Sequence, residues 1–343
     1  MKLVMIASAA LALLLGAAAH AGEAATAPST EELGITCDRA CLIGVMDQYL
    51  AAMIAHDPAA VAFATHAKFT ENGVVLPIGT AAWQTMDSLG AFKQYVADPQ
   101  GHSVGFLGTI REHGHESILS VRLKLSDRVI EEAEQIVLRK RPGYDLDDPA
   151  GWDERMQPGS GRTYTTADWN DTLEPGERVP RDRMIAIANS YFSAIQGGAA
   201  TPVPFASNCY RIENGVVTSG AAATGPDASN GVASSEFARR HCAEQLSTKG
   251  FFVFDNELRG RRFSVVDEEK GIVFAQVFFD HAGTAKFHMD TNGNKVPMGS
   301  GGGGDLPNSI FINEIFWIKN GVIQHIAANI ITVPYGMPSG WEQ

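Results

Sequence analysis

The sequence is poor in cysteine and in positive charge. Of its 343 residues only 4 are cysteine, and 27 Lys and Arg against 39 Asp and Glu give a formal net charge of −12. A chain this acidic is a poor match for nucleic acid or for an anionic membrane surface, because long-range attraction is missing. The composition therefore favours a neutral or apolar small molecule as ligand.

Sequence signatures for several kinds of chemistry are also missing. The chain has no P-loop, no dinucleotide fingerprint, no nucleophile elbow and no His-Glu-x-x-His. It also lacks the paired Cys-x-x-Cys spacing of a structural zinc site. Covalent and redox mechanisms are consequently not predicted, and neither a metal nor another cofactor is expected.

Long apolar runs are absent except at the N-terminus. Met1-Lys2 precedes an apolar run from Leu3 to Ala19, which ends in Ala19-His20-Ala21. A charged start, a short apolar stretch and a small-x-small site predict a signal peptide over residues 1–21 rather than a membrane span. We therefore expect an exported protein, periplasmic or secreted, and an even number of cysteines suits that oxidising setting.

The four cysteines predict one disulfide and leave a second open. Cys209 lies on a predicted strand and Cys242 on the predicted helix that follows, so one bridge is expected between them. Cys37 and Cys41 share a predicted helix face, and their pairing requires a distorted first turn because disulfide geometry is demanding. The alternative is that both are small buried residues.

One five-residue motif occurs twice. Glu71 to Val75 and Glu213 to Val217 both read Glu-Asn-Gly-Val-Val, at an offset of 213 − 71 = 142 positions. The same offset relates Tyr49 to Tyr191, together with neighbouring apolar residues spaced as one face of an amphipathic helix. The chain therefore carries one folding unit twice, and function is expected at equivalent places in both copies.

Each unit is predicted as helices followed by an antiparallel meander, which is an α+β arrangement. We expect domains at residues 35–140 and 181–343, joined by a Pro-, Gly-, Asp- and Thr-rich linker over 141–180 that packs across both units. In the first unit the main predicted elements are helices over 37–55 and 81–96, and strands near 68–70, 104–111, 117–125 and 129–138.

The second unit contains two insertions, at residues 221–233 and 292–304. The second insertion is Gly-rich, but strand-like residues follow it where a phosphate loop requires a helix. A plain loop or a lid is therefore predicted there rather than a phosphate cradle.

A helix carrying Met46-Asp47-Gln48-Tyr49-Leu50-Ala51-Ala52 precedes the strand Ala67-Lys68-Phe69-Thr70-Glu71, and Gly79-Thr80-Ala81-Ala82 follows. This pattern resembles the SnoaL-like and NTF2-like cone fold, a curved antiparallel sheet packed around helices. Among the ketosteroid isomerases of that fold, Tyr49 matches the oxyanion-hole tyrosine and Glu71 the general-base aspartate. The departures are Glu in place of Asp and a slightly shorter interval. Two such units after a signal peptide are similar to exported tandem SnoaL-like proteins.

The resemblance implies that the two copies differ. Tyr191 and Glu213 fall at the same places in the second unit, and Glu314 is the nearest match to the isomerases' protonated aspartic acid. A register shift of one residue would place Asn313 there instead. The first unit has Ser120-Val121 at that point, so only the second copy resembles the complete set. An asymmetric pair with at most one well-formed active site is expected.

The physical case for these residues is independent of the resemblance. A tyrosine hydroxyl in an apolar cavity must find a partner and can donate to a developing oxyanion. A glutamate facing the same cavity loses hydration, which raises its pKa and makes it a competent base near neutrality. The alternatives are that Tyr49 and Tyr191 are core tyrosines, and that Glu71 and Glu213 only brace the Asn-Gly turns that follow them.

Further candidates lie on later strands. His325 and Asn329 are four apart on the last strand, so they share a face, which we expect to look into the cone with His325 as an acid/base group or a satisfied buried histidine. Arg261 and Arg262 begin a strand and either orient an anionic or phenolate ligand or form surface salt bridges. Phe316 is expected to contact the ligand or to plug the cavity.

Two groups of residues contain the side-chain types that bind metals. His113 and His115 flank Gly114, which predicts a solvated hairpin tip rather than a metal pair. Asp280, His281, His288 and Asp290 flank the Gly-rich insertion, but no fixed ligand spacing supports a metal site there.

Together these residues predict a cofactor-independent acid/base lyase or isomerase acting on a hydrophobic, aromatic small molecule. In that mechanism Glu213 or Glu71 takes a proton from the substrate. Tyr191 or Tyr49 stabilises the oxyanion that develops, and Glu314 or His325 supplies a proton to the leaving group. A sharper version, implied by the fold resemblance, is formaldehyde-releasing cleavage of lignin-derived aryl dimers. The alternatives are a non-catalytic binding or scaffolding protein and a hydrolase that uses a Glu-activated water. The sequence leaves open whether the chain forms a homo-oligomer.

Overall fold

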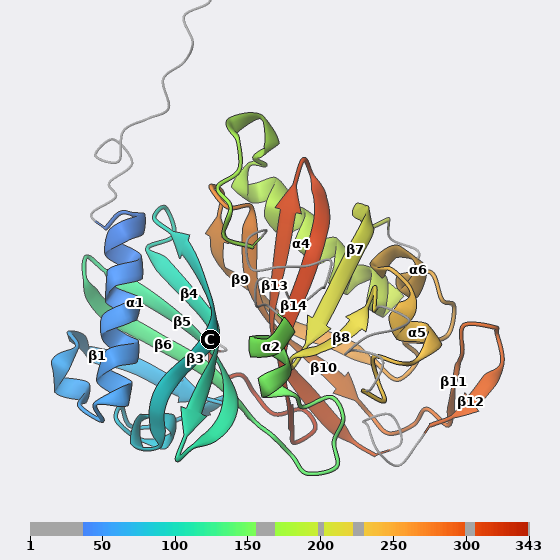
Figure 1. Cartoon of the computed structure of the whole chain (residues 1–343), viewed down its shortest axis with the longest axis horizontal. Helices are drawn as coiled ribbons and strands as arrows, with labels where there is room; N and C mark the ends of the chain where they lie inside the picture. The colour runs from blue at the N-terminus through green and yellow to red at the C-terminus, as the bar shows by residue number, and fades with distance from the viewer. Residues whose placement is uncertain (1–36, 156–168, 198–201, 222–229, 299–305, 342–343) are drawn as a thin grey trace, which may run out of the picture.

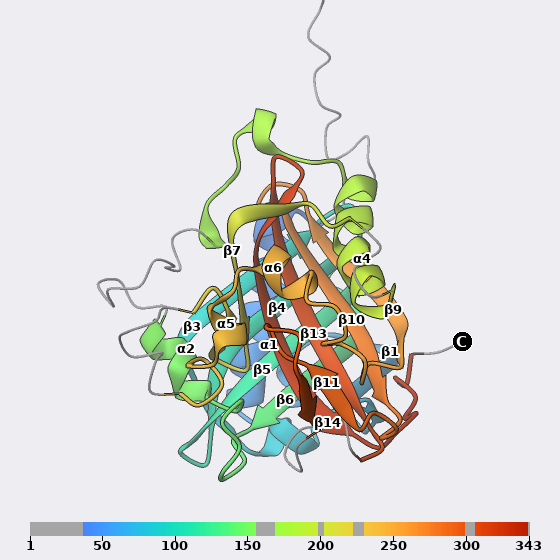
Figure 2. The same cartoon turned by 90° about the vertical axis from the view of Figure 1, so that its right-hand side faces the viewer.

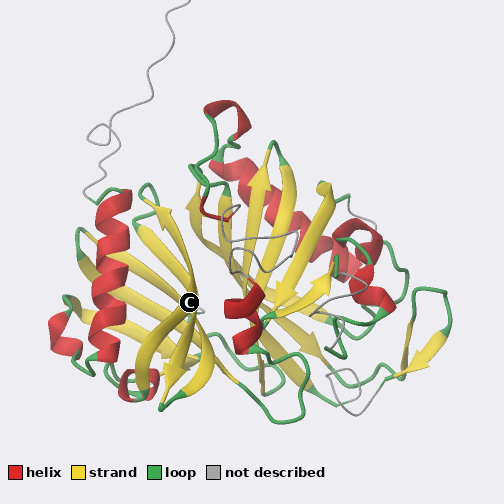
Figure 3. Cartoon of the chain, viewed as in Figure 1, coloured by secondary structure: helices red, strands yellow, loops and turns green. Residues whose placement is uncertain are grey.

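The computed structural model describes residues 37–155, 169–197, 202–221, 230–298 and 306–341. The predicted signal peptide lies outside the described residues, as do residues 222–229 of the first insertion and 299–304 of the second. The predicted α+β fold is confirmed, with two six-stranded sheets, one in each half of the chain and each packed against helices (Figures 1 and 3). No helix within the described ranges is long and apolar enough to cross a membrane.

The first unit consists of one long helix, two short 3₁₀ helices and six strands. The side chain of Asp38 caps helix α1 by accepting the N–H of Cys41. In the sheet the strands follow the order β2-β1-β6-β5-β4-β3, with β1 parallel to β6 and every other neighbour antiparallel. The elements are α1 (Arg39–Ile54), η1 (Pro58–Ala60), β1 (Phe63–Glu71), β2 (Val74–Val75), η2 (Ala81–Gln84), β3 (Met86–Asp98), β4 (Ser103–Glu112), β5 (His115–Ser126) and β6 (Val129–Arg139).

The second unit repeats this plan. Its sheet has the order β8-β7-β14-β13-β10-β9, and β7 is parallel to β14 as β1 is to β6. The repeated elements are α4 (Arg181–Gly197), β7 (Phe205–Glu213), β8 (Val216–Ser219), β9 (Glu257–Asp267), β10 (Ile272–His281), β13 (Asn308–Lys319) and β14 (Val322–Val333). The additions are α5 (Glu236–Arg239), α6 (Cys242–Leu246), and a hairpin of β11 (Phe287–Met289) and β12 (Lys295–Pro297). Figure 2 shows α4, α5 and α6 on the side of this sheet away from the first unit.

The duplicated motif forms the same tight hairpin in both units. Asn72 and Gly73 have φ values of 53° and 80°, and Asn214 and Gly215 have 50° and 84°. Two consecutive positive φ values are typical of the type I′ turn that Asn-Gly favours. The turn joins β1 to β2 and β7 to β8, so Glu71 is the last residue of β1 and Glu213 the last residue of β7.

The prediction of a helix over residues 81–96 is wrong. Only residues 81–84 are helical, as η2, and residues 86–98 form β3, which pairs with β4. Phe92, Gln94 and Val96 are buried and alternate with more exposed neighbours, so the segment has the period of a strand. Gly90 lies where the ladder is irregular, and a side chain there would collide with Thr109. Pairing across the sheet therefore overrides the local helical pattern.

Residues 141–155 of the predicted linker pack on both units. Helix α2 (Pro149–Arg155) lies against β3, β4 and β5 of the first unit. The carboxylate of Asp153 accepts the backbone N–H of Phe92 at 2.7 Å. On the other side, the N–H of Asp148 donates to the carbonyl of Asn214 in the second unit at 2.9 Å. A short 3₁₀ helix, η3 (Pro175–Glu177), precedes α4.

Three apolar cores hold the molecule together. One lies inside each unit, between its sheet and its long helix, and a third lies between the two sheets. The third core includes Ile118 and Ile136 from the first sheet, and Phe274 and Ala327 from the second. Both faces of each sheet are therefore covered, one by a helix and one by the other sheet.

The contact between the units has an approximate two-fold symmetry. Arg181 at the start of α4 pairs with Asp98 of the first unit at 2.7 Å. Arg39 at the start of α1 pairs with Asp267 of the second unit. Arg39 and Arg181 are separated by the repeat offset, 181 − 39 = 142, and each aspartate also accepts a backbone N–H from the other unit. Such reciprocal contacts are the pattern of an isologous dimer interface, here within one chain.

Both cysteine pairs form disulfides. The predicted Cys209–Cys242 bridge is confirmed and ties β7 to α6. Cys37 and Cys41 are also bonded. Cys37 precedes the capping residue Asp38 and therefore lies outside the helix, so the bridge distorts no helical turn.

Candidate functional site

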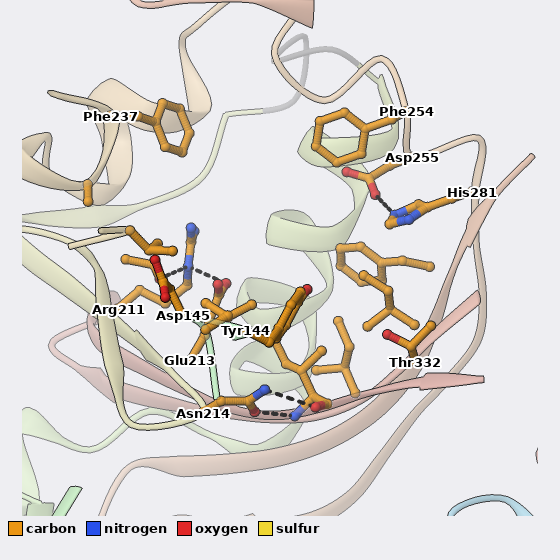
Figure 4. Close-up of a pocket in the computed structure, with 18 of the residues that line it drawn as sticks. Tyr144, Asp145, Arg211, Glu213, Asn214, Phe237, Phe254, Asp255, His281 and Thr332 are labelled. Carbon is orange, nitrogen blue, oxygen red and sulfur yellow. Dashed lines mark hydrogen bonds and ion pairs between the residues drawn. The ribbon is translucent and has the colours of Figure 1, made fainter. Parts of the chain in front are cut away.

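A pocket of about 550 Å³ lies in the second unit, on the face of its sheet that is turned away from the first unit. We call it the second-unit pocket (Figure 4). Its size is within the range of sites for small organic molecules. Isoleucines of β13 and β14 form part of the floor, and five phenylalanines contribute to the wall: Phe237, Phe251, Phe252, Phe254 and Phe279. The pocket is therefore suited to an aromatic or otherwise apolar ligand.

The linker forms one side of the second-unit pocket. Tyr144 and Asp145 are among its lining residues. Asp147 anchors this stretch, because it accepts Arg141 Nε at 2.7 Å and Asn214 Nδ2 at 3.2 Å. A segment that joins the two units thus contributes a wall to the pocket of one of them.

Arg211 is a buried polar group of the pocket that contacts three other side chains. It extends from β7 and is only 6% exposed. Its Nε lies 2.8 Å from Glu213 Oε1 and 3.1 Å from Thr218 Oγ1, and its Nη1 donates to the hydroxyl of Tyr191 at 3.0 Å. Burial lowers the pKa of Arg211, but nearby carboxylates, Glu213 first, outweigh burial and raise that pKa above its ordinary value. Arg211 is therefore a fixed positive charge.

Glu314 and Tyr191 lie behind Arg211. Glu314 is on β13, 2% exposed, and burial raises its pKa to about 8. It is therefore protonated at neutral pH, and it interacts with Tyr191. Its Oε2 has no hydrogen-bond partner in the part of the chain that the structure describes. Burial also raises the pKa of Tyr191. Neither residue lines the second-unit pocket.

A histidine–aspartate pair lies across the pocket from Arg211 (Figure 4). His281 ends β10, and Asp255 lies in the loop before β9. The Nε2 atom of His281 is 2.7 Å from Asp255 Oδ1, and both side chains are almost fully buried. Burial raises the pKa of Asp255. His281 Nδ1 is buried and has no hydrogen-bond partner among the described residues, although the residue itself is part of the pocket lining.

The equivalent residues of the first unit are tied to each other. Tyr49 donates to Gln135 Oε1 at 3.0 Å, and Gln135 Nε2 donates to Glu71 Oε2 at 2.8 Å. Glu71 also accepts the N–H of Ala82 at 2.9 Å and pairs with Arg139 at 3.3 Å. Tyr49 and Glu71 are therefore close together as expected, but protein groups occupy their hydrogen-bonding positions.

The expectation that His325 and Asn329 look into the helix-covered side of the sheet is wrong. Both do share one face of β14, but that face packs against the first sheet. The His325 ring lies 4.1 Å from that of Tyr210 and 4.6 Å from that of Trp317, and burial lowers its pKa to about 3. Asn329 donates to Ser120 Oγ at 3.1 Å. Alternation predicts which residues share a face, but here both faces are buried.

The residues predicted to contact substrate lie elsewhere. Arg261 donates to polar side chains of α4. Arg262 donates from both terminal nitrogens to the carboxylate of Glu134 in the first unit, at 2.6 and 2.8 Å. Phe316 packs on the ring of Tyr191 with centroids 5.4 Å apart. None of the three lines the second-unit pocket.

Metal-ligating clusters are not found among the described residues. No group of three or more His, Cys, Asp or Glu side chains in these ranges is placed to hold a metal ion. Asp280 instead pairs with Arg259 at 2.7 Å and accepts Ser309 Oγ at 2.5 Å. His113 and Gly114 form the turn between β4 and β5, both with positive φ.

Sequence reasoning missed Arg211 and Asp255, and it considered His281 only as a metal ligand. A signal for Arg211 was present in the repeat, since the offset of 142 pairs it with Phe69, 211 − 69 = 142. An arginine where the sister copy has a buried phenylalanine indicates a changed environment. Asp255 and His281 carried no such signal, because they come from a loop and a strand end that meet only after folding.

Comparison with known proteins finds a match in the second half of the chain. Residues 177–330 match a family model described as a domain of unknown function, DUF8021. The matched range begins before α4 and ends within β14, so it covers most of the second unit, while the linker wall of the pocket, Arg141 to Leu146, and Thr332 lie outside it. No curated protein matches the chain, and no solved structure does.

Proposed function

We propose that the protein is a cofactor-independent lyase or isomerase that moves a proton on a hydrophobic, aromatic small molecule in the second-unit pocket. The observation that carries this proposal is the buried His281–Asp255 pair, which faces the same aromatic-walled pocket as Arg211 and Glu213. A proton acceptor and a positive charge that flank an apolar site are the two groups that proton abstraction next to a carbonyl or hydroxyl requires.

His281 is the group that we assign to proton abstraction. Its Nε2 is held by Asp255, which fixes the ring and stabilises the imidazolium that forms when Nδ1 takes a proton. Glu213, the base expected from the sequence, is paired with Arg211 at 2.8 Å. It would have to give up that ion pair to accept a proton, so its carboxylate is the poorer base of the two.

The first unit is proposed to have a structural role only. Gln135 already satisfies both Tyr49 and Glu71, which leaves neither one available to a substrate. Catalysis in this proposal is therefore confined to the second unit.

The wider proposal is a tandem SnoaL-like or NTF2-like protein that is exported. The support is the strand order, which repeats in both halves, and the presence of two disulfides, which are typical of oxidising compartments. Within that fold, formaldehyde-releasing cleavage of lignin-derived aryl dimers is the sharpest candidate reaction. There, a base removes the proton of a hydroxymethyl group, the carbon–carbon bond breaks to release formaldehyde, and the resulting carbanion is reprotonated.

The test is a screen of purified protein against two substrate sets. Aryl dimers that carry a hydroxymethyl group are assayed for formaldehyde, and aryl ketones are assayed by NMR for deuterium exchange at the α-carbon in D₂O. For any substrate that turns over, His281→Gln is expected to lower kcat roughly 10²- to 10⁴-fold, the usual contribution of a general base. Asp255→Asn should lower it less, because the imidazole remains.

His288→Gln is the matched control, since His288 contacts Phe251 but does not line the pocket. Full activity in His281→Gln together with loss of activity in Glu213→Gln would transfer the base role to Glu213. Ligand binding without turnover of any substrate would favour the alternative of a binding protein.

A further inference from the structure

We infer that Arg211 is the residue that selects the substrate, by donating a hydrogen bond to a neutral oxygen such as that of an aryl ketone, and that the second-unit pocket rejects aryl carboxylates. This inference deepens the proposed function and rests on it for the location of the site. Its physical basis is the way in which Arg211 is held.

Two of the three guanidinium nitrogens of Arg211 are already occupied. Nε contacts Glu213 and Thr218, and Nη1 donates to Tyr191. Nη2 has no hydrogen-bond partner among the described residues. It is also not fully buried, because the fully buried side-chain atoms that lack a partner do not include it. Since Arg211 lines the pocket while only 6% exposed, Nη2 is the donor that a bound molecule meets. A side chain held at two points presents its third donor with little loss of entropy.

Arg211 also takes the place that the sequence suggested for Tyr191. The hydroxyl of Tyr191 accepts from Arg211, is 3% exposed and does not line the pocket. A substrate oxygen would therefore meet the guanidinium before it could reach the tyrosine. Any negative charge that develops on that oxygen during proton abstraction would be stabilised by a fixed cation in a dry site.

The charge balance around Arg211 indicates a neutral substrate. Glu213 neutralises the guanidinium, and Glu314 behind it is protonated at neutral pH. A ligand carboxylate would meet the carboxylate of Glu213 beside Arg211 and that of Asp255 across the pocket, while Arg141, the other arginine of the lining, is already paired with Asp147. A ketone oxygen only accepts a hydrogen bond and adds no charge, so the pocket admits it without repulsion.

Three naphthalene derivatives of nearly the same shape separate the hydrogen bond to a neutral oxygen from the repulsion of a carboxylate: 2-acetylnaphthalene, 2-isopropenylnaphthalene and 2-naphthoate. Their binding to the full mature chain can be followed by titration calorimetry at pH 7. The ketone is expected to bind roughly ten- to a hundred-fold more tightly than the olefin, the usual value of a hydrogen bond to a charged donor. The carboxylate is expected to bind more weakly than the ketone.

Variants at two positions test the cause of this selectivity. Arg211→Met should abolish the preference for ketone over olefin. Because that change leaves Glu213 unpaired and destabilises the fold, a second variant, Arg211→Met/Glu213→Gln, removes the ion pair as a neutral unit and should also lose the preference. Glu213→Gln alone leaves Arg211 without its counter-charge, so the affinity for 2-naphthoate should rise at least tenfold. Glu71→Gln, the same change in the first unit, should alter none of the three affinities.

The inference is overturned if wild-type protein binds ketone and olefin equally, if none of the three ligands binds, or if folded Arg211 variants keep the preference. It is also overturned if Glu213→Gln leaves the affinity for 2-naphthoate unchanged. Failure of the proposed function is a separate result, since these assays measure binding only. A protein that never turns over a substrate but needs Arg211 for its ketone preference would refute the catalytic proposal and keep this one.

Discussion

The two units place different side chains on one strand plan. In each sheet, four neighbouring strands contribute one residue each to a row that runs across the strands. Position by position, the rows of the first and second sheets are Glu71 and Glu213, Gln135 and Ala328, Val121 and Glu314, and Phe106 and Ala275. The backbone arrangement is the same in both. The difference in function that we propose therefore depends on a few side chains in this row and beside it.

In the first unit the row is filled by large side chains. Gln135 is long enough to bridge Tyr49 and Glu71, and Phe106 is fully buried in the core. In the second unit Ala328 and Ala275 occupy the matching positions, so no amide separates the tyrosine from the carboxylates. Arg211 takes that role instead, where the first unit has Phe69.

The comparison shows what a buried charge cluster requires. Arg211 is stabilised only because Glu213, Thr218 and Tyr191 all contact it. The first unit uses a neutral amide between its tyrosine and its glutamate, and the arginine that pairs with this glutamate, Arg139, has a side chain that is 47% exposed. The first unit thus joins its tyrosine to its glutamate through a neutral amide, whereas the second unit places a buried arginine between them at the edge of the second-unit pocket.

Glu314→Gln is expected to have the largest effect on stability. The folded-state pKa of Glu314, about 8, is above its ordinary value of 4.5, so between these pH values the folded protein holds a proton that the unfolded chain releases. Its contribution is therefore present below about pH 4.5 and is lost as the pH rises to about 8, by at most about 1.4 kcal/mol for each pH unit. Urea denaturation across this range should give a flatter pH profile for the variant than for wild type.

Glu112 of the first unit supplies the opposite case. Burial raises its pKa, but hydrogen bonds from Arg139 and Thr85 outweigh burial and hold that pKa below its ordinary value. Its stabilisation is therefore present above the unfolded-state pKa and is lost as the pH falls. The difference between wild type and Glu112→Gln should shrink in acid, and equal slopes for the two glutamine variants would contradict the contrast between the units.

The two disulfides should differ in their contribution. Cys209–Cys242 closes a separation of 33 residues and Cys37–Cys41 one of 4. Loop-closure entropy then predicts a loss of about 3 to 4 kcal/mol for Cys209→Ser/Cys242→Ser and about 2 kcal/mol for Cys37→Ser/Cys41→Ser. Chemical denaturation measures both values under the same conditions.

Ligand affinity extends this test to the pocket. The Cys209–Cys242 bridge ties β7, which carries Arg211, to α6, which follows the pocket-lining helix α5. Its removal should weaken binding of 2-acetylnaphthalene, whereas removal of Cys37–Cys41 should not. A matching loss of affinity in both double variants would show that general stability, and not the pocket wall, controls binding.

Gln135→Met is expected to have the smallest effect on stability. It removes the amide that accepts from Tyr49 and donates to Glu71, and leaves a buried hydroxyl without its acceptor. The expected loss is about 1 to 2 kcal/mol in the free energy of unfolding. Gln324→Met on β14, whose amide makes only contacts of 3.4 Å, is the control and should be close to neutral. A neutral Gln135→Met would mean that the bridge does not stabilise the first unit.

Local patterns predicted much of the fold. The repeat offset predicted that Tyr49 and Tyr191 occupy the same place on a long helix, and both are buried on the inner faces of α1 and α4. The Asn-Gly dipeptides predicted the hairpins, since their positive φ values depend on two residues only. The prediction of a helix over residues 81–96 was wrong because their apolar residues have spacings that suit a helix. The conformation of residues 86–98 is decided by pairing with β4, which lies elsewhere in the sequence.

The candidate site was predicted only in part. Tyr191, Glu213 and Glu314 do converge in the second unit, around an arginine that the repeat marked as different from Phe69. The position of His325 was missed for a general reason. Alternation along a strand assigns residues to two faces but does not say which face meets a pocket when both are covered.

By itself the sequence determined a duplicated α+β plan, the Asn-Gly hairpins and the Cys209–Cys242 bridge, because periodicity, turn propensity and residue spacing act over short distances. Only the tertiary structure decided that Arg211 stands between Tyr191 and the pocket, and that Asp255 meets His281. Those contacts join residues 20 and 26 positions apart, on elements whose relative placement depends on how the sheet and the surrounding loops pack.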